Sequence, residues 1–283
     1  MDPVDAAAPN DGWAVAREAA KRAGVVVAPL TSLDDADAVN DVIERVWGAQ
    51  HLHRELIRAL EHSGNALVGA REGDGFVGFA LGFAGTAGGL HLHSHMAAVV
   101  PELQHRGVGY ALKLAQRAAC LDAGIPEIRW TYDPLVARNG RFNLVKLGAV
   151  ATAFWPEFYG TMSDRLNAGD RSDRFEVVWR LRSERAERAL AGRPEEPADG
   201  RVLLAMDERE RPYRASRADA TGDVVLVAVP RDHTAMKARD PELAEQWRRT
   251  AAEAFRECFD AGLVATAMTP DSRYAFRPDK EAT

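Results

Sequence analysis

The chain has 283 residues, of which 46% are hydrophobic and 28% are charged, the composition of a globular protein with a large buried core. A net charge of −6 weakens attraction to nucleic acids and anionic membranes, and no apolar run approaches the roughly 20 residues of a membrane span. The first residues, MDPVDAAAPND, lack the apolar stretch of a secretory signal, which predicts a cytoplasmic protein whose partners are small molecules.

Helical spacing of apolar residues alternates with short apolar runs from the first strand-like segment, VVVAP, to FEVVWRL. Glu72-Gly73-Asp74-Gly75 separates two of these runs and has the turn chemistry of a β-hairpin. The predicted order of strands and helices is β, α, α, β, β, β, α, β, α, β, β. These elements span residues 25–29, 33–47, 52–60, 66–83 (the hairpin), 89–100, 108–123, 127–133, 137–147, 149–160 and 175–181.

A change of composition follows this series. The stretch from Ser183 to Gly200 is charged and rich in Ala, Pro and Gly, which is typical of a connector. Beyond it, strand-like runs flank a helix that begins at Asp240-Pro241 and ends before Gly262. These few elements are expected to extend the first sheet and not to form a domain of their own. The predicted division is a tail with a short helix (1–24), a main α/β domain (25–183), a connector (184–200) and a C-terminal α/β extension packed on the main domain (201–283).

A glycine turn joins a strand to a helix at Gln104-His105-Arg106-Gly107-Val108-Gly109. The first N–H groups of a helix lack partners and lie at the positive end of its dipole, and glycine lets a ligand approach the backbone closely. With the added charge of Arg106, this geometry suits a pyrophosphate. Alone the pattern is also compatible with a simple connection. The spacing differs from the Rossmann fingerprint, and the Gly-Lys-Ser/Thr of a P-loop is missing.

The segment AVVPELQHRGVGYAL resembles the coenzyme A motif of the GNAT-fold acyltransferases, and the order of elements from about Val25 to Leu181 is also similar to that fold. Over nearly the whole chain, the sequence is also similar to a bacterial GNAT subgroup of predicted acyltransferases. The segments that carry this similarity are HSHMAAV, WTYDPLVARNGRFNLVKLGAV, FYGTM, SDRFEVVW and PELAEQWRRTAAEAF. The resemblance implies an α/β (α+β) fold: a mixed, mostly antiparallel central sheet flanked by helices, which opens after its fourth strand. It also implies acetyl-CoA or another acyl-CoA as co-substrate.

Within this resemblance, the turn would hold the pyrophosphate, and backbone near Val99 would pair with the pantetheine. A buried amide such as that of Asn139 would contact the same arm. The residues expected to bind acyl-CoA are Val99, Gln104, His105, Arg106, Gly107, Val108, Gly109, Tyr110 and Asn139.

Three histidines, His91, His93 and His95, alternate along the strand before the turn, so they should form a row with Cα atoms about 6.5 to 7 Å apart. Two imidazoles could share a zinc ion, but a third from one flat strand is poorly placed for a tetrahedron, so we predict no resident metal. Structural histidines and acid–base catalysis both stay open, because imidazole titrates near neutral pH. Where some GNATs carry a carboxylate base, six positions before the motif Val, this chain has His93, with His95 behind it.

The resemblance also implies a general acid, since many GNATs place a Tyr two residues before Lys-x-Gly-Phe to protonate the leaving thiolate. Leu144 occupies that position here, which leaves Tyr159, Tyr132 or water. On the acceptor side, Asp133 could cap a turn or bind substrate, and Arg174 could bind a carboxylate or join a surface pair. The residues expected to bind the acceptor are Trp130, Asp133, Asn143 and Arg174.

The sequence therefore predicts an N-acyltransferase that moves an acetyl group, or another short acyl group such as succinyl, from coenzyme A to the amine of a small molecule, an amino acid among the options. One alternative is an acyl-CoA-binding protein whose catalytic groups have decayed, because the usual Tyr and strand carboxylate are missing. Another is a zinc enzyme built on the histidine row. A homodimer stays open.

Overall fold

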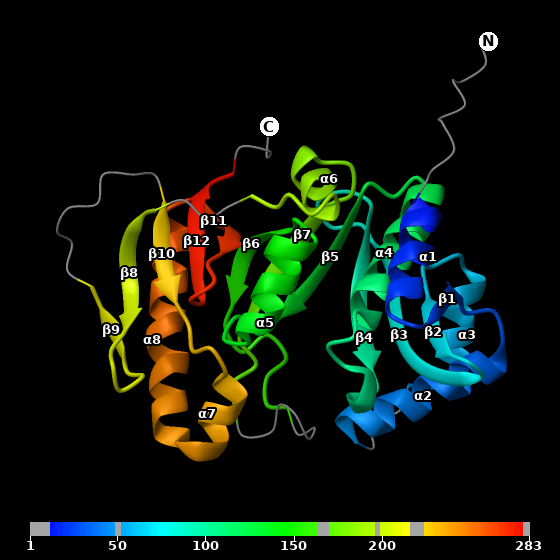
Figure 1. Cartoon of the computed structure of the whole chain (residues 1–283), viewed down its shortest axis with the longest axis horizontal. Helices are drawn as coiled ribbons and strands as arrows, with labels where there is room; N and C mark the ends of the chain where they lie inside the picture. The colour runs from blue at the N-terminus through cyan, green and yellow to red at the C-terminus, as the bar shows by residue number, and fades with distance from the viewer. Residues whose placement is uncertain (1–11, 49–51, 163–169, 196–198, 216–223, 280–283) are drawn as a thin grey trace, which may run out of the picture. The chain divides into compact units, whose positions relative to one another are not determined.

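The computed structural model describes residues 12–48, 52–162, 170–195, 199–215 and 224–279. They fall into two compact units (Figure 1). The described part of the N-terminal unit ends at Arg129, and the C-terminal unit begins at Trp130. Strand β5 (Glu127–Tyr132) starts in the first unit and ends in the second. None of the helices in these ranges combines the length and apolar character of a membrane span.

The N-terminal unit is built on an antiparallel sheet in which β1, β2, β3 and β4 are neighbours in chain order. Every residue of β3 from Val77 to Gly82 is buried, as expected for a strand covered on both faces. Helices α2 and α4 both pack on this strand. The elements are α1 (Gly12–Arg22), β1 (Val26–Pro29), α2 (Leu33–Trp47), α3 (Arg54–His62), β2 (Val68–Glu72), β3 (Gly75–Gly85), β4 (His91–Val99) and α4 (Val108–Asp122).

Local chemistry fixes two of the boundaries in this unit. Ser32 caps α2: its hydroxyl accepts from the Asp35 N–H, and the Asp35 carboxylate accepts from the Ser32 N–H. Such a cap typically contributes about 1 kcal/mol. Between β2 and β3, Gly73 takes φ 57°, in the left-handed region that glycine tolerates. The hairpin turn predicted from Glu72 to Gly75 is confirmed.

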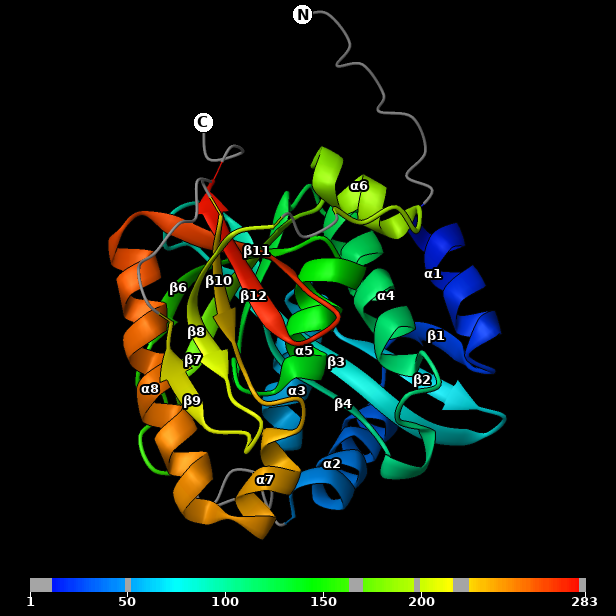
Figure 2. The same cartoon turned by 60° about the vertical axis from the view of Figure 1, so that its left-hand side comes forward.

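In the C-terminal unit the strand order is β7-β6-β11-β12-β10-β8-β9. Strand β11 pairs with β6 through Ala265 and Ala151, so the block beyond residue 200 continues the sheet that contains β6 and β7. Figure 2 shows α8 alongside β8 and β9. The elements are α5 (Ala137–Gly140), the π-helical turn η2 (Arg141–Lys146), β6 (Val150–Trp155), β7 (Arg174–Arg180), α6 (Glu184–Leu190), β8 (Arg201–Met206), β9 (Pro212–Arg214), β10 (Val225–Ala228), α7 (His233–Arg239), α8 (Pro241–Asp260), β11 (Leu263–Met268) and β12 (Arg273–Pro278).

An aromatic cluster forms the core of this unit. Phe175 of β7 lies 4.6 Å, between ring centroids, from Phe255 of α8 and 5.2 Å from Tyr274 of β12. Phe276 of β12 lies edge-on to Phe259 of α8, with ring centroids 5.3 Å apart. Phe175, Phe255, Tyr274 and Phe276 are all almost fully buried. Residues on both sides of the predicted connector therefore share one hydrophobic core.

The predicted order of elements from 25 to 181 is confirmed, with one difference: the helix expected over 137–147 is α-helical only to Gly140 and then becomes a π-helix. The mixed, mostly antiparallel fold class is confirmed too. Within the described residues, the pairs β4–β5 and β8–β10 are parallel, and the antiparallel pairs include β1–β2, β2–β3, β3–β4, β6–β7, β6–β11, β11–β12, β10–β12 and β8–β9. The expected N-terminal tail lies largely outside the described residues.

Candidate functional site

The glycine motif lies on a strand-to-helix turn, as its sequence predicts. Strand β4 ends at Val99, a single 3-10 turn (Pro101–Leu103) follows, and α4 begins at Val108. The Gln104 side chain donates from Nε2 to the carbonyl oxygen of Val99, at 3.2 Å, and so folds the turn back onto the strand end. Gly107, the residue before the helix, takes φ 93°. A side chain would be strained in that left-handed conformation, which explains a glycine at this position.

The first turn of α4 exposes backbone donors. Gly107 provides no capping side chain, and no other described group accepts a hydrogen bond from the N–H of Val108 or Gly109. A Cβ added at Gly109 would meet only Val99 Cγ2, at 3.9 Å, so this backbone is open to a ligand. Arg106 is exposed, with Nη1 3.5 Å from Glu72 Oε1. The turn can therefore present two N–H groups, a helix dipole and one cation to an anion.

The other residues expected around the cofactor have mixed placements. Val108 is buried, so its contribution to a ligand would come from its N–H alone. The Val99 carbonyl accepts from Gln104 and has a second lone pair, so this bond leaves room for a pantetheine N–H at Val99. Tyr110 lies half-buried on the first turn of α4, and burial raises the pKa of its phenol. His105 is exposed and takes φ 69°, which is unusual for a residue other than glycine.

Strand β4 is regular from His91 to Ser94 and contains a bulge at the third of the three histidines. Pairing with β3 joins Phe83 to His93 and Gly82 to Ser94, then resumes at Leu81 and Met96, so His95 is the extra residue. His93 and His95 lie together, with ring centroids 6.1 Å apart. Phe83 lies against both, 5.1 Å from His93 and 5.9 Å from His95.

His91 does not join this pair, and its contacts are with the surrounding backbone. It is buried, its Nδ1 is 2.8 Å from the Gly89 carbonyl oxygen, and its ring covers Gly85. A Cβ at Gly85 would lie 2.4 Å from His91 Nε2, so the glycine makes room for the imidazole. The candidate acid–base groups are thus reduced to His93 and His95.

Desolvation by the surrounding protein lowers the pKa of the His95 imidazole below its ordinary value, although part of the side chain is exposed. His95 is therefore largely neutral at pH 7, in the form that accepts a proton. In the part of the chain that the structure describes, no three His, Cys, Asp or Glu side chains are arranged to hold a metal ion.

A buried polar network that the sequence analysis missed lies on the opposite face of β4. Ser94 donates to Gln116 Oε1 at 2.8 Å, and Lys113 Nζ donates to the Ser94 hydroxyl at 2.7 Å. All three side chains are buried, and burial lowers the pKa of Lys113 to about 7. A sequence signal existed: a lysine stands between Leu112 and Leu114 inside a helix whose apolar face is wide.

In the C-terminal unit, Asp133 is held by Arg248, a residue of α8 that the sequence analysis also missed. Arg248 Nη1 and Nη2 lie 2.7 and 2.8 Å from the two Asp133 oxygens, and Nε lies 3.0 Å from Asp170 Oδ1. The Leu135 N–H also donates to Asp133. Burial acts in the opposite direction, but the bonds and charge of Arg248 hold the pKa of Asp133 below its usual value. Both oxygens of Asp133 are engaged by Arg248, so the structure gives this carboxylate an ion-pair role, and substrate binding by Asp133 stays a prediction.

Trp130 is also a core residue: it is buried, with its ring edge-on to Trp179 at 6.3 Å. Asn143 lies on the π-helical turn and is only 4% exposed, and its side-chain amide has no hydrogen-bond partner in the described residues. Asn139 is half-buried on α5, before the helix changes type. The two amides are therefore the groups of this helix that a ligand could engage.

Arg174 is a buried arginine with weak hydrogen-bond acceptors around it. It is 7% exposed, its Nη1 donates to the Asp173 carbonyl at 3.2 Å, and its Nη2 lies 3.3 Å from Met162 Sδ. No carboxylate in the described residues lies within ion-pair distance of it. Since a thioether is a weak acceptor, the described residues leave much of the guanidinium's donor capacity unused.

Tyr159 lies beneath this guanidinium, whose carbon is 5.5 Å from the centre of the phenol ring. The Tyr159 hydroxyl is 3.3 Å from Thr131 Oγ1, and the side chain is exposed. Tyr132, the other tyrosine considered as an acid, is fully buried and donates to the Tyr274 hydroxyl, and burial raises its pKa. Leu144, at the position where a GNAT tyrosine was expected, is a core residue.

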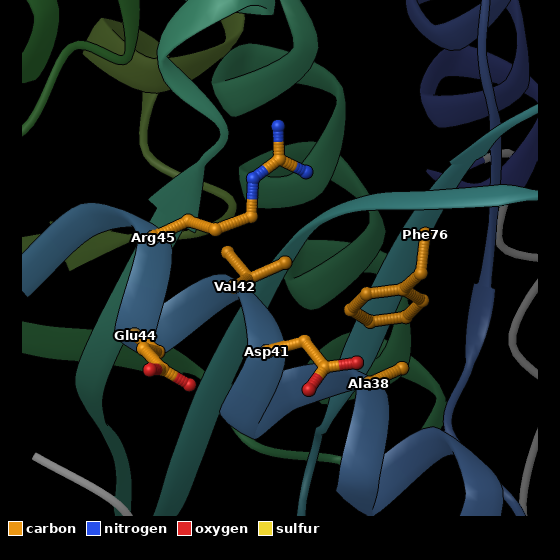
Figure 3. Close-up of a pocket in the computed structure, with 6 residues that line it drawn as sticks. All are labelled: Ala38, Asp41, Val42, Glu44, Arg45 and Phe76. Carbon is orange, nitrogen blue, oxygen red and sulfur yellow. The ribbon is translucent and has the colours of Figure 1, made fainter. Parts of the chain in front are cut away.

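A separate hollow of the N-terminal unit lies on α2 (Figure 3). Two acids and one arginine line it, so it is a poorer match for phosphate than the glycine turn. Arg45 also donates to Glu102 Oε2 at 2.9 Å and so ties α2 to the segment after β4. The lining residues are Ala38, Asp41, Val42, Glu44, Arg45 and Phe76.

No protein-family model matches the sequence, and no curated protein sequence matches it. Among solved structures, the chain is similar to Ard1 of Thermoplasma volcanium, with 20% identity and a TM-score of 0.43 over 55% of this chain and 96% of that one. It is similar to an acetyltransferase of the GNAT family from Desulfovibrio desulfuricans, with 23% identity and a TM-score of 0.44 over 56% and 99%. It is also similar to the ribosomal-protein-S18-alanine N-acetyltransferase of Escherichia coli, with 14% identity and a TM-score of 0.45 over 56% and 94%.

Proposed function

We propose that the protein is a GNAT-fold, acyl-CoA-dependent N-acyltransferase. The observation that carries the proposal is the uncapped start of α4, where the motif residues open the backbone of Val108 and Gly109 to an anion. In this proposal the coenzyme A pyrophosphate accepts from those two N–H groups, and Arg106 adds a neutralising charge. Exchange of the weak Arg106–Glu72 contact for a pyrophosphate contact favours binding, since the ion pair is solvent-exposed.

His93 and His95 supply the base in this proposal. The acceptor amine must lose a proton before or during its attack on the thioester carbon, and the neutral imidazole of His95, with His93 beside it, supports that role. The new C–N bond forms as the C–S bond breaks, and the thiolate takes a proton from water or from a donor such as Tyr159. Proximity of amine and thioester would supply most of the acceleration.

Arg174 is the proposed binding group for a carboxylate of the substrate pair. That carboxylate belongs either to an amino-acid acceptor or to a dicarboxylic acyl group such as succinyl, with acetyl as the default acyl group. The support is the buried guanidinium whose acceptors are one carbonyl and one thioether. A bidentate carboxylate would be a stronger partner than the Met162 sulfur.

The test is release of the coenzyme A thiol from acetyl-CoA and succinyl-CoA in the presence of a panel of amines and amino acids. We expect amine-dependent release, and a lower rate in Arg174→Gln for carboxylate-bearing substrates only. The exposed Arg138→Gln is the matched control. If no amine causes thiol release while acetyl-CoA still binds, the second candidate is favoured: an acyl-CoA-binding protein whose catalytic groups have decayed. The support for this candidate is that buried Leu144 occupies the position where a catalytic tyrosine was expected.

A further inference from the structure

The polar network beneath β4 is costly for the fold and has no part in the chemistry proposed above. Ser94 is 5% exposed, Lys113 is 5% exposed and Gln116 is fully buried. Taking an amine and a hydroxyl out of water costs several kcal/mol unless hydrogen bonds compensate. An apolar side chain at 113 would fill the same space at lower cost. The hydrogen-bonding capacity of Lys113 therefore calls for an explanation.

The network is attached to β4 at the bulge. Ser94 pairs with Gly82 and immediately precedes His95, the extra residue. A Cβ at Gly82 would lie 2.8 Å from the His93 carbonyl oxygen, so β3 requires glycine at this position. Strand β3 therefore offers no side chain that could hold the bulge in place. The bulge is held instead from the other face of β4, where two side chains of α4 form hydrogen bonds with the Ser94 hydroxyl. These two bonds, to Lys113 at 2.7 Å and to Gln116 at 2.8 Å, are the anchor of the bulge.

We propose that Lys113 and Ser94 are positioning residues, which hold the β-bulge at His95, so that His93 and His95 stay on one face of β4. The proposal rests on the proposed function for its catalytic consequence. A one-residue slip of a strand moves each side chain to the opposite face. Without the anchor, the bulge can move by one residue to Ser94. His95 would then pair with Gly82, next to the His93–Phe83 pair, and would leave the cluster it forms with His93 and Phe83.

The test compares Ser94→Ala and Lys113→Met with Lys21→Met, which makes the same change at an exposed lysine of the same unit. We expect the first two variants to change the imidazole NMR signals and pKa of His95, and to lower kcat about tenfold, with KM for acetyl-CoA within about twofold of wild type. The double variant should be no worse than either single variant, because both break one link. Ser94→Thr keeps a hydroxyl and should restore most of the rate.

Two results would overturn the proposal. One is that folded Ser94→Ala and Lys113→Met leave the His95 signals and kcat unchanged. The other is that both variants lose melting temperature and apparent kcat falls only in proportion to the fraction of folded protein, while the His95 signals of that folded fraction match wild type, which a merely structural network would produce. If the histidine signals move in the variants but wild type releases no thiol, the positioning role stands and the proposed function fails, so the two failures are distinguishable.

Discussion

At the scale of single residues, the placement of His95 depends on one extra residue in β4. The register of β4 is regular from His91 to Ser94, and the bulge adds His95. His93 and His95 lie beside Phe83, whereas His91 is buried against Gly85. Alternation in the sequence was enough to find the strand and its histidines. It could not locate the bulge, because a bulge depends on the partner strand and on the helix packed beneath.

The histidine pair gives the first prediction. His93→Ala or His95→Ala should lower kcat/KM by the roughly 10² to 10⁴ typical of a lost general base. Because the pKa of His95 is lowered, the acidic limb of the wild-type pH–rate profile should lie below the ordinary imidazole pKa of about 6.5, and it should disappear in the damaging variant. His91→Ala is the control and should keep that limb. Wild-type rates and pH profiles in both single variants would make the pair structural.

Lys113 gives a second prediction at this scale. Its pKa is lowered to about 7 in the folded protein, against 10.5 when exposed. Between these values the unfolded chain binds a proton that the folded chain lacks, so this group makes stability rise with pH over that window. Relative to Lys113→Met, wild type should gain about 1.4 kcal/mol of unfolding free energy per pH unit above pH 7.

Urea unfolding at several pH values measures this difference. The comparison with Lys113→Met removes the contribution of Cys120, whose thiol pKa burial raises to about 12, because both proteins contain it. A free-energy difference that stays flat from pH 7 to 9 would show that Lys113 remains charged in the folded protein. The sequence could not foresee this group, since a buried lysine is recognised by its partners on another element.

At the scale of elements, the start of α4 was predictable and its chemistry follows from backbone geometry. Pro101 ends the strand, Gly107 allows a left-handed φ, and the helix begins with no side-chain cap. By contrast, β12 was missed although Tyr274 and Phe276 alternate in it, because six residues near the end of a chain form a weak pattern. The π-helical turn was missed too, since apolar spacing over Ala137 to Leu147 fits an α-helix as well.

The glycine turn gives the third prediction. Gly107→Glu should lower the affinity for acetyl-CoA at least about tenfold, because a carboxylate would stand where the pyrophosphate is proposed to bind. Gly124→Glu is the matched control: it lies at the other end of α4, also at positive φ and with open space around it. Both variants carry similar backbone strain, so a difference between their affinities for acetyl-CoA reports a direct effect on the ligand. Equal affinities by calorimetry would remove the pyrophosphate from this turn.

At the scale of the whole molecule, the division expected from composition at 184–200 has to be weighed against contacts that cross it. Strand β11 pairs with β6, Phe255 packs on Phe175, and Arg248 holds Asp133. The shift in composition at the connector was visible in the sequence. The sequence also favoured an extension of the first sheet, but it could not name the residues of the shared core, because these depend on which strands become neighbours. We propose that the C-terminal extension is an integral part of the C-terminal unit and not an autonomous domain.

Arg248 provides the fourth prediction. Arg248→Met should destabilise the protein by about 2 to 4 kcal/mol, because it leaves the partly buried carboxylates of Asp133 and Asp170 without their buried cation. Arg249→Met, an exposed neighbour on the same helix, should change stability by less than about 0.5 kcal/mol. Urea unfolding of the full chain measures both. Equal stability of the two variants would mean that the extension is held by its apolar contacts alone.

A crystal structure of the full chain with acetyl-CoA would show directly whether acyl-CoA binds at the start of α4. We expect pyrophosphate oxygens within hydrogen-bond distance of the N–H groups of Val108 and Gly109, with Arg106 turned towards them. Coenzyme A bound elsewhere, for example in the hollow on α2 around Arg45, would contradict it.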